Sequence, residues 1–152
     1  MRSALAPSAG MRSAARHLPA AAFITLAVAG IILGPAAIFG GWNLASQPDG
    51  SGMQMPVSWL EHSPFADYLV PGLILLVVFG IGSFVLVALG LFRAAIAPYL
   101  AIALGAGQLI WIGVQLAMIR TWHPIMHPLL IAVGAALVVC GTLWWRAWRP
   151  AD

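Results

Sequence analysis

Two histidines beside a turn have the spacing that best suits metal binding in this chain. His123 and His127 are four positions apart, which on a helix would place both imidazoles on one face, as metal ligands often are. Pro124 and Pro128 each follow one of these histidines, and proline disfavours helical conformation at the residue before it. The spacing alone therefore does not guarantee a shared face.

A second loop, predicted on the same side of the membrane, could complete such a site. Glu61, His62 and Asp67 could approach the two histidines and form a small His/carboxylate site for a divalent metal. The alternative is that all five are polar residues at a wet interface, where the prolines shape a turn. Because the sequence contains no established metal-binding motif, we favour this alternative.

Three further residues fall on one face of an apolar segment. Gln108, Trp111 and Gln115 occupy positions i, i+3 and i+7. A glutamine amide in lipid should find a partner, so this face is expected to look into the protein. The amides could bind a cofactor such as a quinone, a lipid headgroup or another amphipathic ligand. The simpler interpretation is hydrogen bonding between helices, worth about 0.6–2 kcal/mol per bond.

The sulfur-containing residues give weaker signals. The single cysteine, Cys140, excludes an intramolecular disulfide and a multi-cysteine zinc site, and we interpret it as a packing residue. Met53, Met55 and Met126 could act as soft copper ligands beside the histidines. No regular methionine motif supports that role, and methionine is also ordinary apolar filler. The cofactor, if there is one, is unknown, and the simplest expectation is none.

The sequence contains no motif that predicts catalysis. It has no phosphate-binding loop, no nucleophile elbow and no HExxH. No charged residue lies inside an apolar segment, although proton-coupled carriers usually need one. An enzyme is therefore not expected, and a transporter is disfavoured.

Composition identifies the environment in which these residues act. The 152 residues are 62% hydrophobic and 7% charged, with mean hydropathy +0.96, whereas soluble domains carry about 25% charged residues. Soluble globular and disordered chains are both excluded, and an integral membrane protein is predicted. The seven arginines flank apolar segments, so they indicate membrane orientation and not nucleic-acid binding.

Four apolar segments are each long enough to cross a bilayer, which takes about 20 residues. They cover residues 18–42, 67–92, 97–119 and 126–145. Short connections make neighbouring helices antiparallel, so we predict an all-α fold, an up-down-up-down bundle of four transmembrane helices. Residues 18–145 form its single domain, with an outer loop at 43–66, a disordered basic tail at 1–17 and a second tail at 146–152.

Arginine placement predicts the orientation. Six arginines fall on one side of the four segments and only Arg120 on the other, so the positive-inside rule places both termini in the cytoplasm. The six are Arg2, Arg12, Arg16, Arg93, Arg146 and Arg149.

Small residues recur in the apolar segments. Gly30 and Gly34 form a GxxxG step, which lets helix backbones approach closely. We favour packing within the bundle, and the alternative is an interface with a second copy or with another membrane protein. The outer loop carries turn residues at Pro48–Ser51 followed by apolar residues, so it should lie on the membrane surface or cap the bundle.

One stretch of sequence resembles a known group of proteins. Ser-Pro-Phe-Ala-Asp-Tyr-Leu-Val-Pro-Gly-Leu at 63–73, the Pro48–Ser51 turn upstream and His127-Pro128 are similar to features of small four-span bacterial membrane proteins that have no established activity. The resemblance implies a bacterial inner-membrane location and assigns no catalytic residue.

Three functions remain open at this stage. The leading hypothesis is a non-enzymatic membrane protein that acts by interaction, as a subunit, stabiliser or sensor accessory. The alternative is a membrane protein that binds a metal, haem, quinone or other ligand, with a site at the outer face. A transporter component is third. The lipid bilayer is the one partner that composition predicts.

Overall fold

The computed structural model describes residues 18–119 and 122–148. The regular structure of these residues is helical, with no strand among them. Four helical segments are long and apolar enough to cross a membrane: Ala20–Ser46, Leu69–Leu91, Ala97–Met118 and Met126–Trp148. The prediction of four helices long and apolar enough to span a membrane is therefore confirmed, and these helices suggest a multi-pass membrane protein. The predicted 1–17 tail, Arg120 and residues 149–152 lie outside the described residues.

The first two spans each contain a wider, π-helical turn. The first consists of α2 (Ala20–Ala27), η1 (Val28–Leu33) and α3 (Gly34–Ser46). The second consists of α4 (Leu69–Ile74), η4 (Leu75–Ile81) and α5 (Gly82–Leu91). Pro35 is the second residue after η1 in the first span. Proline has no N–H, and its ring crowds the carbonyl four residues earlier. A wider turn relieves this conflict.

The spans pack as two close pairs. α3 lies against α4 and η4, and α6 (Ala97–Ile119) lies against α7 (Met126–Trp148). A Cβ atom placed on Gly41 would be 2.5 Å from the backbone nitrogen of Leu76. One on Gly105 would be 2.7 Å from the carbonyl oxygen of Gly134. Glycine at these crossings therefore allows the backbone contact that stabilises helix pairs in lipid.

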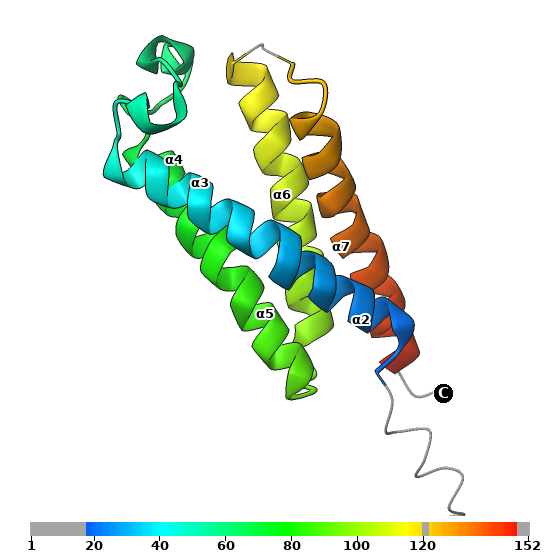
Figure 1. Cartoon of the computed structure of the whole chain (residues 1–152). Coiled ribbons are helices and arrows are strands. Elements are labelled where there is room, and N and C mark those ends of the chain that lie inside the picture. Colours follow the sequence, from blue (N-terminus) through cyan, green and yellow to red (C-terminus); the bar gives the residue numbers. More distant parts are fainter. Residues whose placement is uncertain (1–17, 120–121, 149–152) are drawn as a thin grey trace, which may run out of the picture.

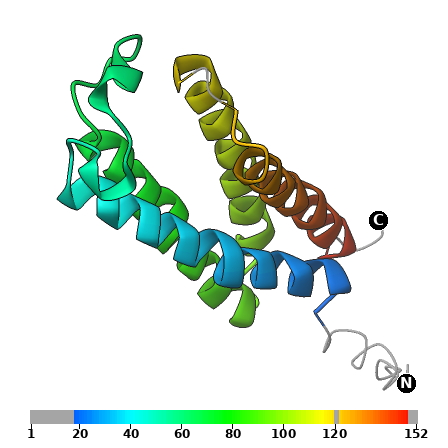
Figure 2. The same cartoon turned by 45° about the horizontal axis from the view of Figure 1, so that its top comes forward.

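The two pairs meet at one end of the molecule and diverge at the other. α2 contacts α7, and α5 contacts α6. Figure 1 shows both pairs converging near α2 and separating toward the loop that joins α3 to α4. Figure 2 shows the same divergence from a second direction. Buried Leu86, Leu137 and Trp144 belong to the main core, so the closely packed part lies away from the diverging ends.

The GxxxG step is used for packing within the chain. A Cβ atom on Gly30 would lie 3.0 Å from Cγ2 of Val87, and one on Gly34 would lie 3.0 Å from Cε2 of Phe84. Both neighbours belong to α5. This contact agrees with the favoured interpretation of the step, and an interface with a partner through the same glycines stays a prediction.

The loop between the first two spans has a small core of its own. It contains two short 3-10 turns, η2 (Ser51–Met53) and η3 (Val57–Leu60). Leu44, Leu60 and Tyr68 are buried together, with Met55 and Phe65 packed against them. The loop therefore folds around its own small core, and its placement relative to the membrane surface stays a prediction.

Hydrogen bonds fix the shape of this loop. The Tyr68 hydroxyl donates to the carbonyl oxygen of Pro56 at 3.1 Å, and its backbone N–H donates to Pro48 at 2.9 Å. Gly50 has φ of +76°, and a Cβ atom there would overlap the Met55 carbonyl, so glycine is needed at this turn. The hydroxyl and then the backbone N–H of Ser51 hold the pKa of Asp49 below its ordinary value.

Candidate functional site

A cavity of about 320 Å³ lies between the diverging helix pairs, beneath the folded loop. This volume is within the range of about 300–1,000 Å³ that small-molecule sites usually have. All four spans and the loop contribute to its walls. The lining residues are Leu33, Ala36, Ala37, Gly40 and Leu44 from the first span; Pro71 and Leu75 from the second; Gln108, Trp111, Ile112, Val114, Gln115 and Met118 from the third; Met126, Leu129 and Leu130 from the fourth; and Met53, Met55, Leu60, Phe65 and Tyr68 from the loop.

Small side chains on α3 help to keep the space open. Ala36, Ala37 and Gly40 line the wall on this side, where larger residues would fill the gap between the pairs. Ala36 stays exposed, as does Leu129 on α7. The cavity is therefore not sealed, and its exposed rim in the spans is apolar.

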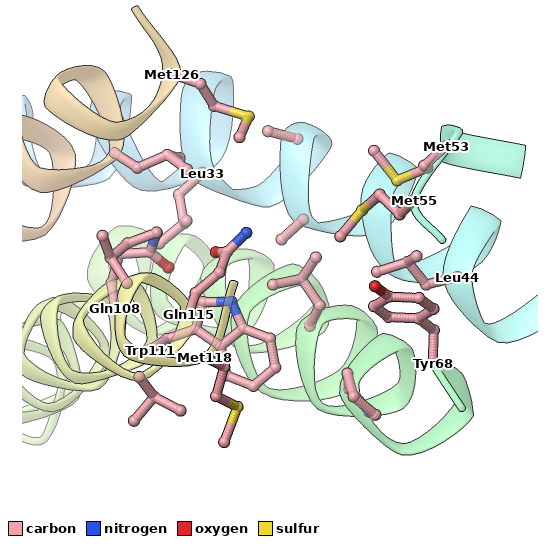
Figure 3. Close-up of a pocket in the computed structure, with 18 of the residues that line it drawn as sticks. Leu33, Leu44, Met53, Met55, Tyr68, Gln108, Trp111, Gln115, Met118 and Met126 are labelled. Atoms are coloured by element: carbon pink, nitrogen blue, oxygen red, sulfur yellow. The ribbon is translucent and has the colours of Figure 1, made fainter. Parts of the chain in front are cut away.

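The face predicted on the third span lines this cavity. Gln108, Trp111 and Gln115 all contribute to its wall, and Figure 3 shows the amide of Gln115 pointing into the open space beside the Trp111 indole. Trp111 also contacts Phe79, with ring centroids 6.1 Å apart. The structure therefore brings the three candidate residues together, and their use in ligand binding remains a proposal.

The side-chain oxygen of Gln108 is the most unusual atom of the site. Gln108 is only 2% exposed, and among the described residues its Oε1 has no hydrogen-bond partner. Such a buried acceptor costs about 1–3 kcal/mol when it is left unpaired. This oxygen forms no hydrogen bond to another helix within the described residues, and it is enclosed, so a molecule in the cavity does not reach it. Trp144 Nε1 is also buried and unpaired, but it does not line the cavity.

The cavity suits a neutral molecule. None of the described residues in its lining is charged. The Tyr68 hydroxyl already donates a hydrogen bond to the carbonyl oxygen of Pro56, and burial raises the pKa of this tyrosine above its ordinary value. A charged ligand would therefore lose its hydration without gaining an opposite charge from these walls.

The two histidines of the fourth span close the beginning of α7. Nδ1 of His123 accepts a hydrogen bond from the Met126 N–H at 3.2 Å, and Nδ1 of His127 accepts one from the His123 N–H at 2.7 Å. This exchange resembles a capping box, in which side chain and backbone satisfy each other at a helix start. His127 is buried and stacks on Trp122 at 5.2 Å. The pair therefore has a structural role, with one nitrogen of each ring in use.

His127 is helical although a proline follows it. His127 lies within α7, which begins at Met126. Pro128 falls in the first turn of that helix, where a backbone N–H would have no intrahelical partner and its absence costs little.

The other three metal candidates belong to the loop. Glu61 and His62 are exposed and follow η3, while Asp67 is half-buried. Oδ1 of Asp67 accepts a hydrogen bond from the Leu69 N–H at 2.9 Å, at the start of α4. Within residues 18–119 and 122–148, no three histidine, cysteine or acidic side chains come together in a group that could hold a metal ion. The five-residue metal site stays a prediction.

Sequence reasoning grouped Met53, Met55 and Met126 only as possible copper ligands, and it missed Met118 and the shared cavity. The chain has six methionines, and the four that follow residue 11 all line the cavity: Met53, Met55, Met118 and Met126. Their positions in the loop and at two facing helix ends were a usable signal. That signal required knowing that these three segments surround one space.

Comparisons with known proteins identify no relative of this chain. No protein family, curated protein or solved structure matches the chain. The function must therefore be argued from the cavity itself.

Proposed function

We propose that this multi-pass membrane protein binds a small, neutral, amphipathic molecule in the cavity between its helix pairs. The observation that carries the proposal is an apolar space of about 320 Å³ that all four spans and the loop enclose, with Gln108 and Gln115 in its wall. A ligand with one polar group would pair with an amide of this wall, and its apolar part would occupy the space beside it. Buried polar groups in proteins are generally paired, with protein, water or ligand.

The proposal extends to the placement of the protein in its membrane. The arginine distribution favours an up-down-up-down bundle with both termini in the cytoplasm, in the inner membrane of a bacterium. The cavity lies on the side of the 47–68 loop, so it would occupy the outer half of the bilayer. A ligand there would exchange with the outer leaflet through the apolar rim.

Action by interaction, as a subunit, stabiliser or sensor accessory, remains a prediction. The cavity gives ligand binding a specific site, and for that reason we prefer it. The two roles are compatible, because a subunit, stabiliser or sensor accessory can also bind a ligand in this cavity.

The test is the identity of what the protein retains. Wild-type protein, Gln108→Met and Gln54→Met are purified from native membranes in mild detergent, and their organic extracts are compared by mass spectrometry. Met is close to Gln in size, and Gln54 is exposed in the loop, so the second variant is a matched control.

We expect one neutral compound at near-equal molar amount with wild-type protein and Gln54→Met, and a clear loss from Gln108→Met. Equal amounts of every compound in all three samples would contradict the proposal.

A further inference from the structure

Two neighbouring side chains on the third span present polar groups that the protein itself does not use. Trp111 and Gln115 lie one turn apart on α6, and both line the cavity. Both are half-buried, and within the described residues neither the indole N–H nor the amide forms a hydrogen bond. Figure 3 shows the Gln115 amide in the open space beside the Trp111 ring. A molecule in this space would therefore meet both groups together.

These polar atoms can be reached from the cavity. Among the described residues, the polar side-chain atoms that are both enclosed and unpaired are Gln108 Oε1 and Trp144 Nε1. The Trp111 nitrogen and the Gln115 amide atoms are unpaired but not enclosed, and their side chains line the space. They are therefore available to a ligand in a way that the Gln108 oxygen is not.

The pair offers mainly hydrogen-bond donors. An indole has one N–H and no acceptor, whereas a glutamine amide has two N–H bonds and one carbonyl oxygen. The Tyr68 hydroxyl, on the same wall, already donates to Pro56. A ligand carbonyl oxygen has two lone pairs, so it could accept one hydrogen bond from each of the two α6 side chains. A ligand hydroxyl would have to direct its proton to the Gln115 oxygen, the one acceptor of the pair.

The rest of the wall favours a flat ring system. Methionine sulfur makes favourable contacts with ring edges, and aromatic pairs gain energy beyond the area they bury. Figure 3 shows the methionines spread around the space, as they would be around an organic molecule and not around a metal ion. Besides Trp111, the methionines and aromatic residues of the lining are Met53, Met55, Met118, Met126, Phe65 and Tyr68.

Volume and charge set the size and the neutrality of the ligand. An apolar cavity of about 150 Å³ holds one benzene ring, so 320 Å³ has room for two fused rings with a small substituent. No charged side chain occurs among the described lining residues, and an ion would lose its hydration without compensation.

We infer that the ligand of this cavity is a neutral aromatic carbonyl compound, of the aryl ketone or quinone class, whose carbonyl oxygen accepts hydrogen bonds from the Gln115 amide and the Trp111 indole. This inference rests on the proposed function and specifies its ligand. It predicts that a fused ring with a carbonyl binds more tightly than the same ring without an acceptor, and more tightly than a carbonyl on a saturated chain.

Four probes separate the ring from the carbonyl. 2-Acetonaphthone has two fused rings and a carbonyl, and 2-isopropenylnaphthalene has the same shape with a CH₂ group in place of the oxygen. 1-(2-Naphthyl)ethanol carries a hydroxyl on the same rings, and 2-dodecanone has the carbonyl without a ring. Binding of each is measured by equilibrium dialysis against lipid nanodiscs that contain the full chain, and empty nanodiscs correct for partition into lipid.

Four variants assign the contacts. Gln115→Leu removes the amide, and Trp111→Phe removes the N–H but keeps an aromatic ring. Gln54→Leu is the matched control, because Gln54 is exposed in the loop and does not line the cavity. Met53→Leu/Met55→Leu keeps the wall apolar and removes two sulfur atoms. Binding of 2-isopropenylnaphthalene to each variant reports whether the cavity itself is intact.

We expect 2-acetonaphthone to bind wild-type protein and Gln54→Leu at one per chain, and about fivefold more weakly to Gln115→Leu and to Trp111→Phe, the effect of losing one hydrogen bond. 2-Isopropenylnaphthalene should bind all of these proteins equally and weakly. The double methionine variant should lose about two- to tenfold in affinity for 2-acetonaphthone, the range expected for sulfur–ring contacts, and should bind 2-dodecanone as wild-type protein does.

Three results would overturn the inference and leave the proposed function intact. Equal affinity of wild-type protein for 2-acetonaphthone and 2-isopropenylnaphthalene would remove the carbonyl requirement. Tighter binding of 1-(2-naphthyl)ethanol would replace the carbonyl by a hydroxyl, and tighter binding of 2-dodecanone would replace the aromatic class by an aliphatic one. If none of the four probes bound saturably at one per chain, the proposed function itself would fail.

Discussion

Replacement of Gln108 by methionine should make the empty protein more stable, although it weakens ligand binding. The Gln108 side chain is 2% exposed, and its Oε1 has no partner among the described residues. An unpaired buried acceptor costs about 1–3 kcal/mol. Methionine has a similar length and volume and carries no amide, so the substitution removes this cost without opening a large hole.

The lower end of that range is the better expectation in a membrane protein. Polar groups in the unfolded, membrane-bound state also find partners, which reduces the difference between the two states. We therefore expect Gln108→Met to raise the free energy of unfolding of the ligand-free protein by about 1 kcal/mol. The exposed control Gln54→Met should stay within about 0.5 kcal/mol of wild-type protein.

The assay is reversible unfolding of delipidated protein in mixed micelles, followed by helical circular dichroism. Each protein is measured without ligand and again with the compound that co-purifies with wild-type protein. Ligand that binds only the folded state adds stability by mass action, so wild-type protein should gain more than Gln108→Met when this compound is added.

A loss of 1 kcal/mol or more in the ligand-free Gln108→Met protein would refute this reasoning. That result would mean that the amide is already paired in the folded protein and acts as a hydrogen bond between helices. The buried oxygen would then carry no information about a ligand.

Three other perturbations test separate parts of the structure. Gly41→Ala should destabilise the protein by about 1–3 kcal/mol because the new Cβ meets the backbone of Leu76. A Cβ atom on Gly113 would have no neighbour within 4 Å, so Gly113→Ala should be neutral or stabilising by up to about 1 kcal/mol. Equal effects of the two glycine substitutions in unfolding assays would contradict the close α3–η4 crossing. Burial raises the pKa of Tyr68 above its ordinary value of 10.0, so the contribution of Tyr68 to stability should be constant below pH 10 and fall above it, because the unfolded state releases this proton first. Tyr68→Phe should lack that share of the fall in a pH series of unfolding curves, and an unchanged alkaline slope would argue against burial of the hydroxyl. His123→Ala should lower stability by about 0.5–2 kcal/mol because it removes the cap of α7, whereas His123→Asn keeps an acceptor and should recover part of that loss. Hydrogen exchange at the first turn of α7 measures both variants. Equal losses of protection in the two would exclude the capping role.

Much of the fold follows from local sequence. Each span is a long apolar segment, and the bounds were predicted within a few residues, from Ala20–Ser46 to Met126–Trp148. The Gln108, Trp111 and Gln115 face was predictable because helical periodicity places these residues together wherever the helix packs. Hydropathy and periodicity are properties of single segments, and both survive tertiary packing.

The cavity was not predictable in the same way. It exists because the α3–α4 and α6–α7 pairs cross at glycines and diverge, and crossing geometry depends on contacts between segments far apart in the sequence. The inward fold of the loop depends equally on Tyr68 bonding to Pro56, twelve residues away. Without these contacts, the four methionines are apolar residues in three unrelated segments.

The most direct measurement is an experimental structure of the protein extracted from its native membrane without added ligand. We expect continuous density for one small molecule in the cavity, with a polar atom within hydrogen-bond distance of the Gln108 or Gln115 amide. A cavity closed by its own side chains, or one that holds no ordered molecule, would contradict the proposed function.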